Sequence, residues 1–254
     1  MKFTRAIVRT PGTSMIFGLS SAGFGPPNYT QALVQHGAYV QALKACGLEV
    51  TVLPPDEEHP DSTFVEDTAL LTPECAIIMR PGATSRRDET ESIEPTLRDH
   101  FKTIEPVQAP GTVDAGDIMM VGRHFFIGLS QRTNAEGAKQ ILEILNRHGL
   151  SGSTVPLKEM LHLKSGVAYL ENDTLVATGE FLNRSEFAKF KVIPILSEEA
   201  YAANCLWLNG TVLVAAGFPQ AKKAVETAGY QTIALEMSEF RKLDGGLSCL
   251  SLRW

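Results

Sequence analysis

The feature that most limits the fold of this sequence is a recurring pattern, in which two apolar, β-rich runs are joined by a short polar turn. Several turns contain residues that suit tight bends, for example Asn209-Gly210 and Gly122-Arg123. The clearest copies are TALLTPECAIIMRPG (68–82), DIMMVGRHFFIGLS (117–130), GVAYLENDTLVATGE (166–180) and CLWLNGTVLVAAG (205–217). Their starts lie roughly 40 to 50 residues apart, a spacing typical of propellers and other repeat proteins. The sequence therefore predicts a repeated β-hairpin unit.

Helical periodicity follows the hairpins. Clear stretches cover roughly 85–101, 133–148 and 219–229, and a weaker one lies near 184–190. A fifth unit has to be assembled from both ends of the chain, with GLSCLSLRW (246–254) pairing with KFTRAIVRTPG (2–12) and a helix at 29–47. Five hairpin-plus-helix units then form one α/β domain over residues 1–254, closed by pairing of the N- and C-terminal strands. A generic α/β sandwich whose hairpins recur by accident is the alternative.

Composition excludes several classes of protein. The chain of 254 residues carries a net charge of −6 and has no basic run, so we expect no nucleic-acid partner. No apolar stretch approaches the roughly 20 residues needed to span a bilayer, and no secretory signal is evident. We therefore expect no membrane partner and a cytoplasmic location. The four cysteines are scattered without a C-x-x-C pair, which argues against a disulfide framework and a structural zinc site.

Acidic residues and glycines gather where three hairpins begin. The clusters are PDSTFVED (60–67), TVDAGD (112–117) and LDGGLSC (243–249). A radial arrangement of the units would point these loops at one centre, where crowded carboxylates need cations or hydrogen-bond donors. A guanidinium suits them, because two carboxylates can fix its plane. The alternative is that these acids are solvated turn residues.

A nucleophile can also be proposed from the residues. Cys249 lies beside glycines that leave room for a substrate, and His162 opens a hairpin as the acid clusters do. Arg86 and Arg132 follow the first and second hairpins, where they could grip a carboxylate, with Arg87 as a competitor for the first role. A core or surface histidine and solvated arginines are the alternatives.

Together these motifs resemble one enzyme family. PDSTFVED, RPGATSRR, APGTVDAGDIMMVG, RTNAEGA, HLKSG, YAANCLW and DGGLSC are similar, in this order, to motifs of the dimethylarginine dimethylaminohydrolases. These enzymes belong to the guanidine-modifying superfamily, which also includes arginine deiminases and amidinotransferases. The resemblance runs along essentially the whole chain, and it implies a five-bladed α/β propeller with the active site in its central channel.

The resemblance also implies catalytic roles. Cys249 is the expected nucleophile, His162 the general acid and base, and Asp114 the acid that orients or polarises the histidine. Some bacterial relatives have Glu at the position of Asp114, and the shorter side chain here puts direct contact with His162 in question. The expected substrate-binding residues are Leu19, Asp61, Glu66, Asp67, Arg86, Arg132 and Leu243.

The implied reaction converts dimethyl- or monomethyl-L-arginine to citrulline and an amine through a covalent thiouronium on Cys249. It needs neither a metal nor an organic cofactor. Because carboxylates disfavour a nearby thiolate, we expect Cys249 to be mainly a thiol in the free enzyme. We also expect the Gly-, Ser- and Pro-rich segment 11–29 to be an irregular lid over the pocket.

Three questions stay open from the sequence. A deiminase acting on free arginine would use the same residues, although such enzymes usually carry an extra helical insertion for which this chain has no room. A non-enzymatic propeller resembling the ribosome anti-association factors would share only the architecture. The oligomeric state is undetermined, and a homodimer is one of the options.

Overall fold

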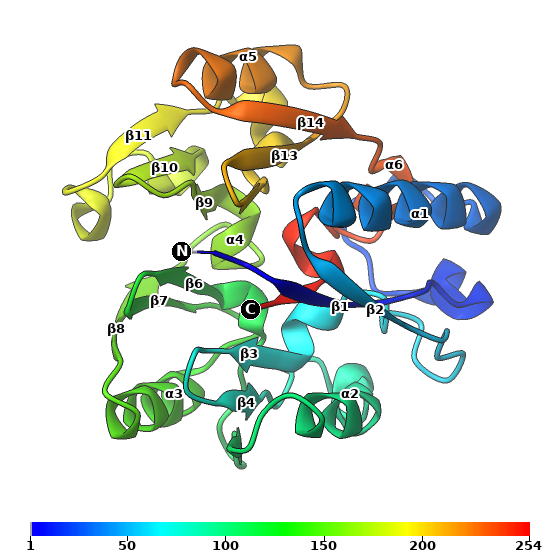
Figure 1. Ribbon diagram of the computed structural model, residues 1–254, viewed down its shortest axis with the longest axis vertical. Helices are drawn as coiled ribbons and strands as arrows, with labels where there is room; N and C mark the ends of the chain where they lie inside the picture. The colour runs from blue at the N-terminus through cyan, green and yellow to red at the C-terminus, as the bar shows by residue number, and fades with distance from the viewer. Residues whose placement is uncertain (1) are drawn as a thin grey trace.

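The computed structural model describes residues 2–254 and contains five three-stranded sheets set around a common centre (Figure 1). In each sheet an antiparallel pair of strands is extended by a third strand, which runs parallel to its neighbour. The five units share one topology, and the structure therefore agrees with the expected five-fold propeller rather than with a sandwich.

Four hairpins fall inside the segments predicted from the sequence. They are β3 (Ala69–Leu71) with β4 (Ala76–Ile78), β6 (Ile118–Val121) with β7 (His124–Leu129), β9 (Val167–Tyr169) with β10 (Thr174–Ala177), and β12 (Leu206–Leu208) with β13 (Thr211–Ala215). The turns at Asn172-Asp173 and Asn209-Gly210 have positive φ at both residues, a conformation that favours Asn, Asp and Gly. The expected turn chemistry therefore sets the hairpin ends.

A helix connects most hairpins to their third strand. These pairs are α1 (Tyr29–Ala45) with β2 (Glu49–Leu53), α2 (Glu89–Arg98) with β5 (Ile104–Pro106), α3 (Ala135–Arg147) with β8 (Ser151–Pro156), and α5 (Pro219–Thr227) with β14 (Gln231–Leu235). Near 184–190 the expected helix is only a 3-10 turn, η6 (Ser185–Phe187), and β11 (Lys191–Pro194) follows it. A short parallel crossover can use tight turns in place of a full helix.

The two ends of the chain share one sheet. β15 (Leu252–Arg253) pairs antiparallel with β1 (Arg5–Arg9), in the register Ala6 to Arg253 and Ile7 to Leu252. Figure 1 shows both termini near the centre of the molecule. Tyr39 of α1 adds a buried hydroxyl contact of 2.6 Å to Ser251. The C-terminal segment is thus fixed on both sides, which explains how a functional cysteine can lie five residues from the end.

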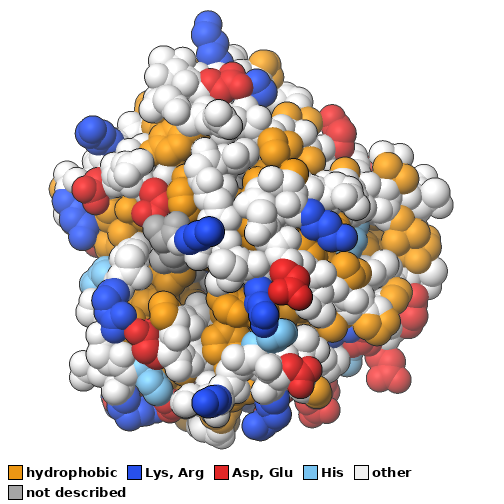
Figure 2. Space-filling view, viewed as in Figure 1, with side chains coloured by type: hydrophobic (Ala, Val, Ile, Leu, Met, Phe, Trp, Pro, Cys, Tyr) orange, Lys and Arg blue, Asp and Glu red, His pale blue; other side chains and the backbone are white. Residues whose placement is uncertain are grey.

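The strands of the hairpins are more deeply buried than the outer strands. The hairpin strands β3, β4 and β10 are buried at every residue, whereas the outer strands β2 and β8 are mostly half-buried and include exposed residues. Helix α3 turns Ala138, Ile141 and Leu145 toward its sheet, the spacing expected of an amphipathic helix. Charged side chains are scattered over the face seen in Figure 2, and hydrophobic groups lie near its middle. The hairpins therefore form the rigid wall around the centre.

Candidate active site

A cavity of about 340 Å³ lies at the centre of the propeller and is lined by residues from loops far apart in sequence. Eight of the ten residues expected at the site line it: Leu19, Asp61, Asp67, Arg86, Arg132, His162, Leu243 and Cys249. Asp114 lies directly behind His162, and Glu66 lines a different cavity. Short 3-10 turns and helix ends at the hairpin entrances present these side chains.

His162 and Asp114 are in direct contact. Nε2 of His162 lies 3.1 Å from Oδ2 of Asp114, so the shorter carboxylate does reach the imidazole. The other oxygen of Asp114 accepts a hydrogen bond of 2.8 Å from the backbone N–H of Gly82, which fixes the carboxylate. Both side chains are buried. The contact holds the imidazole in one orientation and stabilises its charged form.

The carboxylates around His162 determine its protonation. Burial by itself disfavours the imidazolium, but Asp67, Asp114 and Asp117 outweigh this effect and raise the pKa of His162 to about 9. Burial would likewise raise the pKa of Asp114, but its hydrogen bond to His162 and the charge of the imidazolium lower it. At neutral pH the pair is therefore an imidazolium with a carboxylate, and His162 is ready to donate a proton.

Cys249 lies in η8 (Ser248–Leu250), after a double glycine that the packing requires. A Cβ on Gly245 would come within 2.1 Å of the Phe64 ring, and one on Gly246 within 2.5 Å of the Asn204 side chain. The backbone N–H of Gly246 donates to the sulfur of Cys249 at 3.4 Å. The glycines thus let the loop approach its neighbours closely enough to place the thiol in the cavity.

The free thiol is strongly protonated. Burial raises the pKa of Cys249 to about 12, with further contributions from the charges of Glu66 and Asp67, against the smaller opposing effect of the hydrogen bond from Gly246. This direction agrees with the expectation that Cys249 is mainly a thiol before a cationic ligand arrives. A guanidinium near the sulfur would favour ionisation, because it brings a positive charge into the cavity.

Asp67 and Arg86 form a buried ion pair on another wall. Nη1 of Arg86 donates to Oδ2 of Asp67 at 2.6 Å, while the backbone N–H of Gly116 donates to Oδ1 at 3.0 Å. The rest of the Arg86 guanidinium is held mainly by Glu89, whose oxygens accept from Nε and Nη2. Since a guanidinium has five N–H donors, one on Nη1 stays available to a ligand. Arg86 therefore orients Asp67 and can offer one donor to the cavity.

Asp61, Leu19 and Arg132 lie at the mouth. The backbone N–H of Leu19 donates to Oδ1 of Asp61 at 3.0 Å, and burial raises the pKa of this carboxyl. Nη1 of Arg132 is 3.9 Å from Oδ2 of Asp114, and its side chain is about one-fifth exposed. The mouth thus offers an acid and an arginine, groups that suit the two ends of an amino acid.

Residues 11–29 are more ordered than the sequence indicated. They begin with a 3-10 helix, η1 (Thr13–Phe17), that buries Met15 completely, so the expectation of an irregular segment without a packed element was wrong at this point. After Gly18 the chain crosses the cavity mouth, where the hydroxyl of Ser20 donates to the carbonyl of Lys242 at 2.6 Å. The suggested lid movement stays a prediction.

Glu66, which the sequence analysis expects among the substrate-binding residues, lines a second cavity and not the one that holds Cys249 and Asp67. Its carboxylate points away from the cavity that holds Cys249 and Asp67, and it contacts Lys164, Arg253 and Ser248. Successive residues of η2 (Val65–Thr68) face different sides, which the spacing of the two acids could not show. Glu66 therefore does not line the candidate substrate cavity.

Several residues that support the site were missed or left without a role. Asp117 accepts hydrogen bonds from Ser130, from Thr133 and from the backbone N–H of Leu163, next to His162. Glu89, three residues after Arg86 in the sequence, accepts a hydrogen bond from its guanidinium. The sequence showed Asp117 within an acid cluster, but Glu89 gave no signal beyond that of a helix-start acid.

The ligand atoms of Asp67, Asp114 and His162 lie within 4.8 Å of one another, a geometry that could hold a metal ion. A metal would need a neutral imidazole, whereas the raised pKa of His162 favours the imidazolium. The hydrogen bond to Asp114 also occupies Nε2. A metal ion would therefore have to displace this proton and this contact.

Comparison with known proteins identifies the family. The sequence profile described as "N,N dimethylarginine dimethylhydrolase, eukaryotic" matches residues 27–199. The N(G),N(G)-dimethylarginine dimethylaminohydrolase of Pseudomonas aeruginosa is 54% identical over 99% of this chain and 100% of its own. This chain belongs to the dimethylarginine dimethylaminohydrolase family.

Solved structures of the family agree closely with the fold. A C249S mutant of the P. aeruginosa dimethylarginine dimethylaminohydrolase, complexed with citrulline, is 53% identical and superposes with a TM-score of 0.99 over 100% of both chains. A dimethylarginine dimethylaminohydrolase H162G adduct with S-methyl-L-thiocitrulline is 54% identical, with a TM-score of 0.98 over 99% of this chain and 100% of that one. The five-bladed fold is therefore that of the family.

Proposed function

We propose that this protein is a dimethylargininase, which hydrolyses Nω,Nω-dimethyl-L-arginine and monomethyl-L-arginine to L-citrulline and dimethylamine or methylamine. The observation that carries this conclusion is the convergence of a cysteine, a histidine–carboxylate pair and a buried acid on one cavity of a family member. In related structures citrulline accompanies a C249S mutation and an adduct accompanies an H162G mutation, and the same residue types stand at 249 and 162 here.

Substrate binding uses the charges of the cavity. Asp67 holds the guanidinium nitrogens, and its carboxylate is already oriented by Arg86 and Gly116. At the mouth, Asp61 and the carbonyls of Leu19 and Leu243 receive the α-ammonium group. Arg132 and the remaining donor of Arg86 bind the α-carboxylate. The extended substrate thus spans the cavity with its reacting carbon next to Cys249.

The first chemical step forms the covalent intermediate. On substrate binding the Cys249 thiol loses its proton to solvent, and the thiolate attacks the guanidinium carbon to give a neutral tetrahedral adduct. His162, as imidazolium, donates its proton to the departing nitrogen, so that the C–N bond breaks and a neutral amine leaves. A cationic S-alkylthiouronium stays on Cys249, and His162 is neutral.

The second step releases citrulline. Neutral His162 takes a proton from water as the water oxygen bonds to the thiouronium carbon. Collapse of this adduct breaks the C–S bond and expels the thiolate, and the urea product loses its extra proton to solvent. Asp114 keeps the imidazole oriented in both steps. The steps use no metal and no organic cofactor.

The remaining expectations from the sequence belong to this proposal too. We propose one domain over residues 1–254, a small-molecule substrate with no nucleic-acid or membrane partner, and a cytoplasmic location. Within residues 2–254, the structure has no helix of sufficient length and apolarity to cross a membrane. A homodimer stays one option for the assembly.

A turnover assay tests the function. Citrulline and released amine are measured with dimethylarginine, monomethylarginine and arginine, and the Cys249→Ser variant serves as the control. We expect both methylated substrates to be hydrolysed and the variant to lose at least about a thousandfold in kcat. Turnover of arginine alone would make the protein a deiminase, and no turnover with any substrate would favour a binding role.

A further inference from the structure

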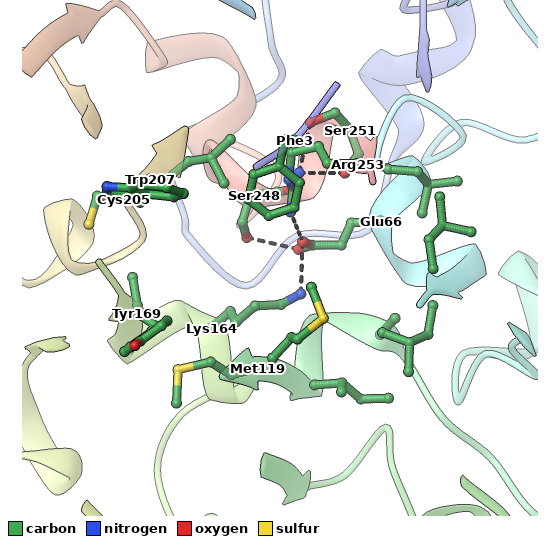
Figure 3. A pocket seen from close by; sticks show the side chains of 18 of the residues that line it. Phe3, Glu66, Met119, Lys164, Tyr169, Cys205, Trp207, Ser248, Ser251 and Arg253 are labelled. Carbon is green, nitrogen blue, oxygen red and sulfur yellow. Dashed lines mark hydrogen bonds and ion pairs between the residues drawn. The ribbon is translucent and has the colours of Figure 1, made fainter. Parts of the chain in front are cut away.

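A second cavity of about 130 Å³ lies on the other side of the catalytic elements, and none of its lining residues is shared with the first (Figure 3). Aromatic and methionine side chains line it, among them Phe3, Tyr169 and Trp207. Glu66 lies inside it, surrounded by Lys164, Arg253 and Ser248 (Figure 3). A buried acid with this number of partners requires an explanation other than substrate binding.

Glu66 uses both carboxylate oxygens. Oε1 lies 2.7 Å from Nζ of Lys164 and accepts at 2.7 Å from Nη2 of Arg253. Oε2 accepts at 2.8 Å from the hydroxyl of Ser248. The Glu66 side chain is 4% exposed, and the two cations are 16% and 11% exposed. Hydrogen bonds to charged groups in such surroundings are stronger and more directional than those at a surface.

Each partner of Glu66 lies close in sequence to the catalytic machinery. Ser248 directly precedes Cys249, and Lys164 follows His162 by two residues in α4 (Leu163–Gly166), for which His162 is the N-cap. Glu66 itself directly precedes Asp67. One carboxylate therefore connects the nucleophile segment, the acid–base segment and the segment that holds the guanidinium.

A second residue completes the connection at Ser248. The side-chain amide of Asn204 donates to the Ser248 hydroxyl at 3.2 Å, and its oxygen accepts from the backbone N–H of Ser248 at 2.9 Å. The hydroxyl proton of Ser248 is therefore directed at Glu66. Asn204 thus donates to the hydroxyl of Ser248, which in turn donates to Glu66. Ser248, the residue before the nucleophile, is therefore held by both its backbone and its side chain.

We propose that Glu66 is a positioning residue, which fixes Cys249 and His162 relative to Asp67 through Ser248 and Lys164 without touching the substrate. This inference rests on the proposed function. Attack on the guanidinium carbon requires the sulfur, the imidazole and the bound cation in one geometry, and a displacement of about 1 Å can cost two orders of magnitude in rate. Glu66 acts on kcat, whereas Asp67 also acts on substrate binding.

Two substitutions that spare Glu66 itself test the proposal. Ser248→Ala removes the link to the nucleophile segment, and Lys164→Met removes the link to the acid–base segment while keeping the length of the side chain. We expect each to lower kcat for dimethylarginine about tenfold and to change KM by less than about twofold. Because both links end on one carboxylate, the double variant should lose clearly less than the product of the two single losses.

Controls and other outcomes make the test decisive. Ser197→Ala and Lys139→Met remove exposed groups that do not belong to the contacts of Glu66 and should leave kcat unchanged. Thermal unfolding shows whether each variant is folded, and if Lys164→Met fails to fold, Ser248→Ala decides alone. Unchanged kcat in folded variants, a loss confined to KM, or fully multiplicative losses would overturn the inference while leaving the function intact. A wild-type protein without turnover would overturn both.

Discussion

Glu66 and Asp67 are neighbours in sequence, yet they line different cavities and have different charged partners. Glu66 is paired with Lys164 and Arg253 and lines the cavity that Cys249 does not line. Asp67 shares the positive charge of Arg86 with Glu89 and faces His162 and the buried thiol. Two cations of the protein balance the charge of Glu66, which suits a structural role. Asp67 shares one cation with Glu89, so its negative charge is only partly balanced and it can accept a cationic ligand.

The largest effect in this comparison is expected at Asp67. Asp67→Asn removes the charge that holds the guanidinium and turns an amide toward Arg86. We therefore expect kcat/KM to fall roughly a hundredfold, a loss of about 2 to 3 kcal/mol of transition-state stabilisation, and KM to rise. Glu66→Gln should lower kcat with KM nearly unchanged. Steady-state kinetics with dimethylarginine distinguishes the two patterns, and equal increases in KM for both variants would remove the difference between the two acids.

A somewhat smaller effect is expected at Asp114. Asp114→Asn deletes the charge next to Nε2, so the pKa of His162 should fall from about 9, because burial then opposes the imidazolium with less compensation. Loss of the general acid should lower kcat at pH 8 by about 10- to 100-fold and shift the basic limb of the pH profile to lower pH. NMR titration of the imidazole follows the pKa directly, with the exposed Asp99→Asn as control. An unchanged titration would show that Asp114 does not act through His162.

The ionisation of Cys249 gives a further test of the electrostatic difference between the two cavities. With a pKa of about 12 in the free protein, its alkylation by iodoacetamide should continue to accelerate above pH 10. A bound cationic substrate analogue that leaves the sulfur accessible should move the apparent pKa down by at least about one unit. Cys249→Ser gives the background from the other cysteines. A low apparent pKa that the analogue does not change would contradict a ligand-dependent thiolate.

The smallest effect concerns stability. Because the folded pKa of His162, about 9, exceeds the ordinary value of 6.5, its contribution to stability is complete below pH 6.5 and is lost as the pH rises through 9. The difference in unfolding free energy between wild type and His162→Gln should therefore shrink by about 1 to 3 kcal/mol between pH 6 and pH 10. Urea titrations at the two pH values measure it. A constant difference would mean that His162 is not stabilised as imidazolium.

Much of the fold could be predicted because its signal is local. The hairpins carry apolar runs with turn residues such as Asn209-Gly210, and the helices carry 3.6-residue periodicity. The outer parallel strands were missed, since β8 (SGSTVP) and β5 (IEP) are short, half-exposed and only partly apolar. Their pairing depends on the tertiary structure more than on the local sequence.

The candidate site likewise has residues that sequence motifs indicated and contacts that only the structure shows. Cys249, His162 and Asp67 stand in distinctive motifs, and the structure brings them to one cavity. The orientation of Glu66 depends on the backbone of η2, and the partnership of Asn204 with Ser248 joins residues 44 positions apart. Neither leaves a pattern in a single sequence. Residue types therefore indicated the chemistry, whereas the supporting contacts required the three-dimensional structure.

The central claim is that Cys249 carries the reaction as a covalent thiouronium that His162 resolves. Mass spectrometry of protein quenched during turnover of dimethylarginine tests it most directly. We predict a thiouronium adduct on the peptide that contains Cys249 in the wild type, little or none from dimethylarginine in His162→Gly, which lacks the general acid of the first step, and none in Cys249→Ser. An adduct on another cysteine, or turnover by the wild type with no adduct on Cys249, would contradict the account.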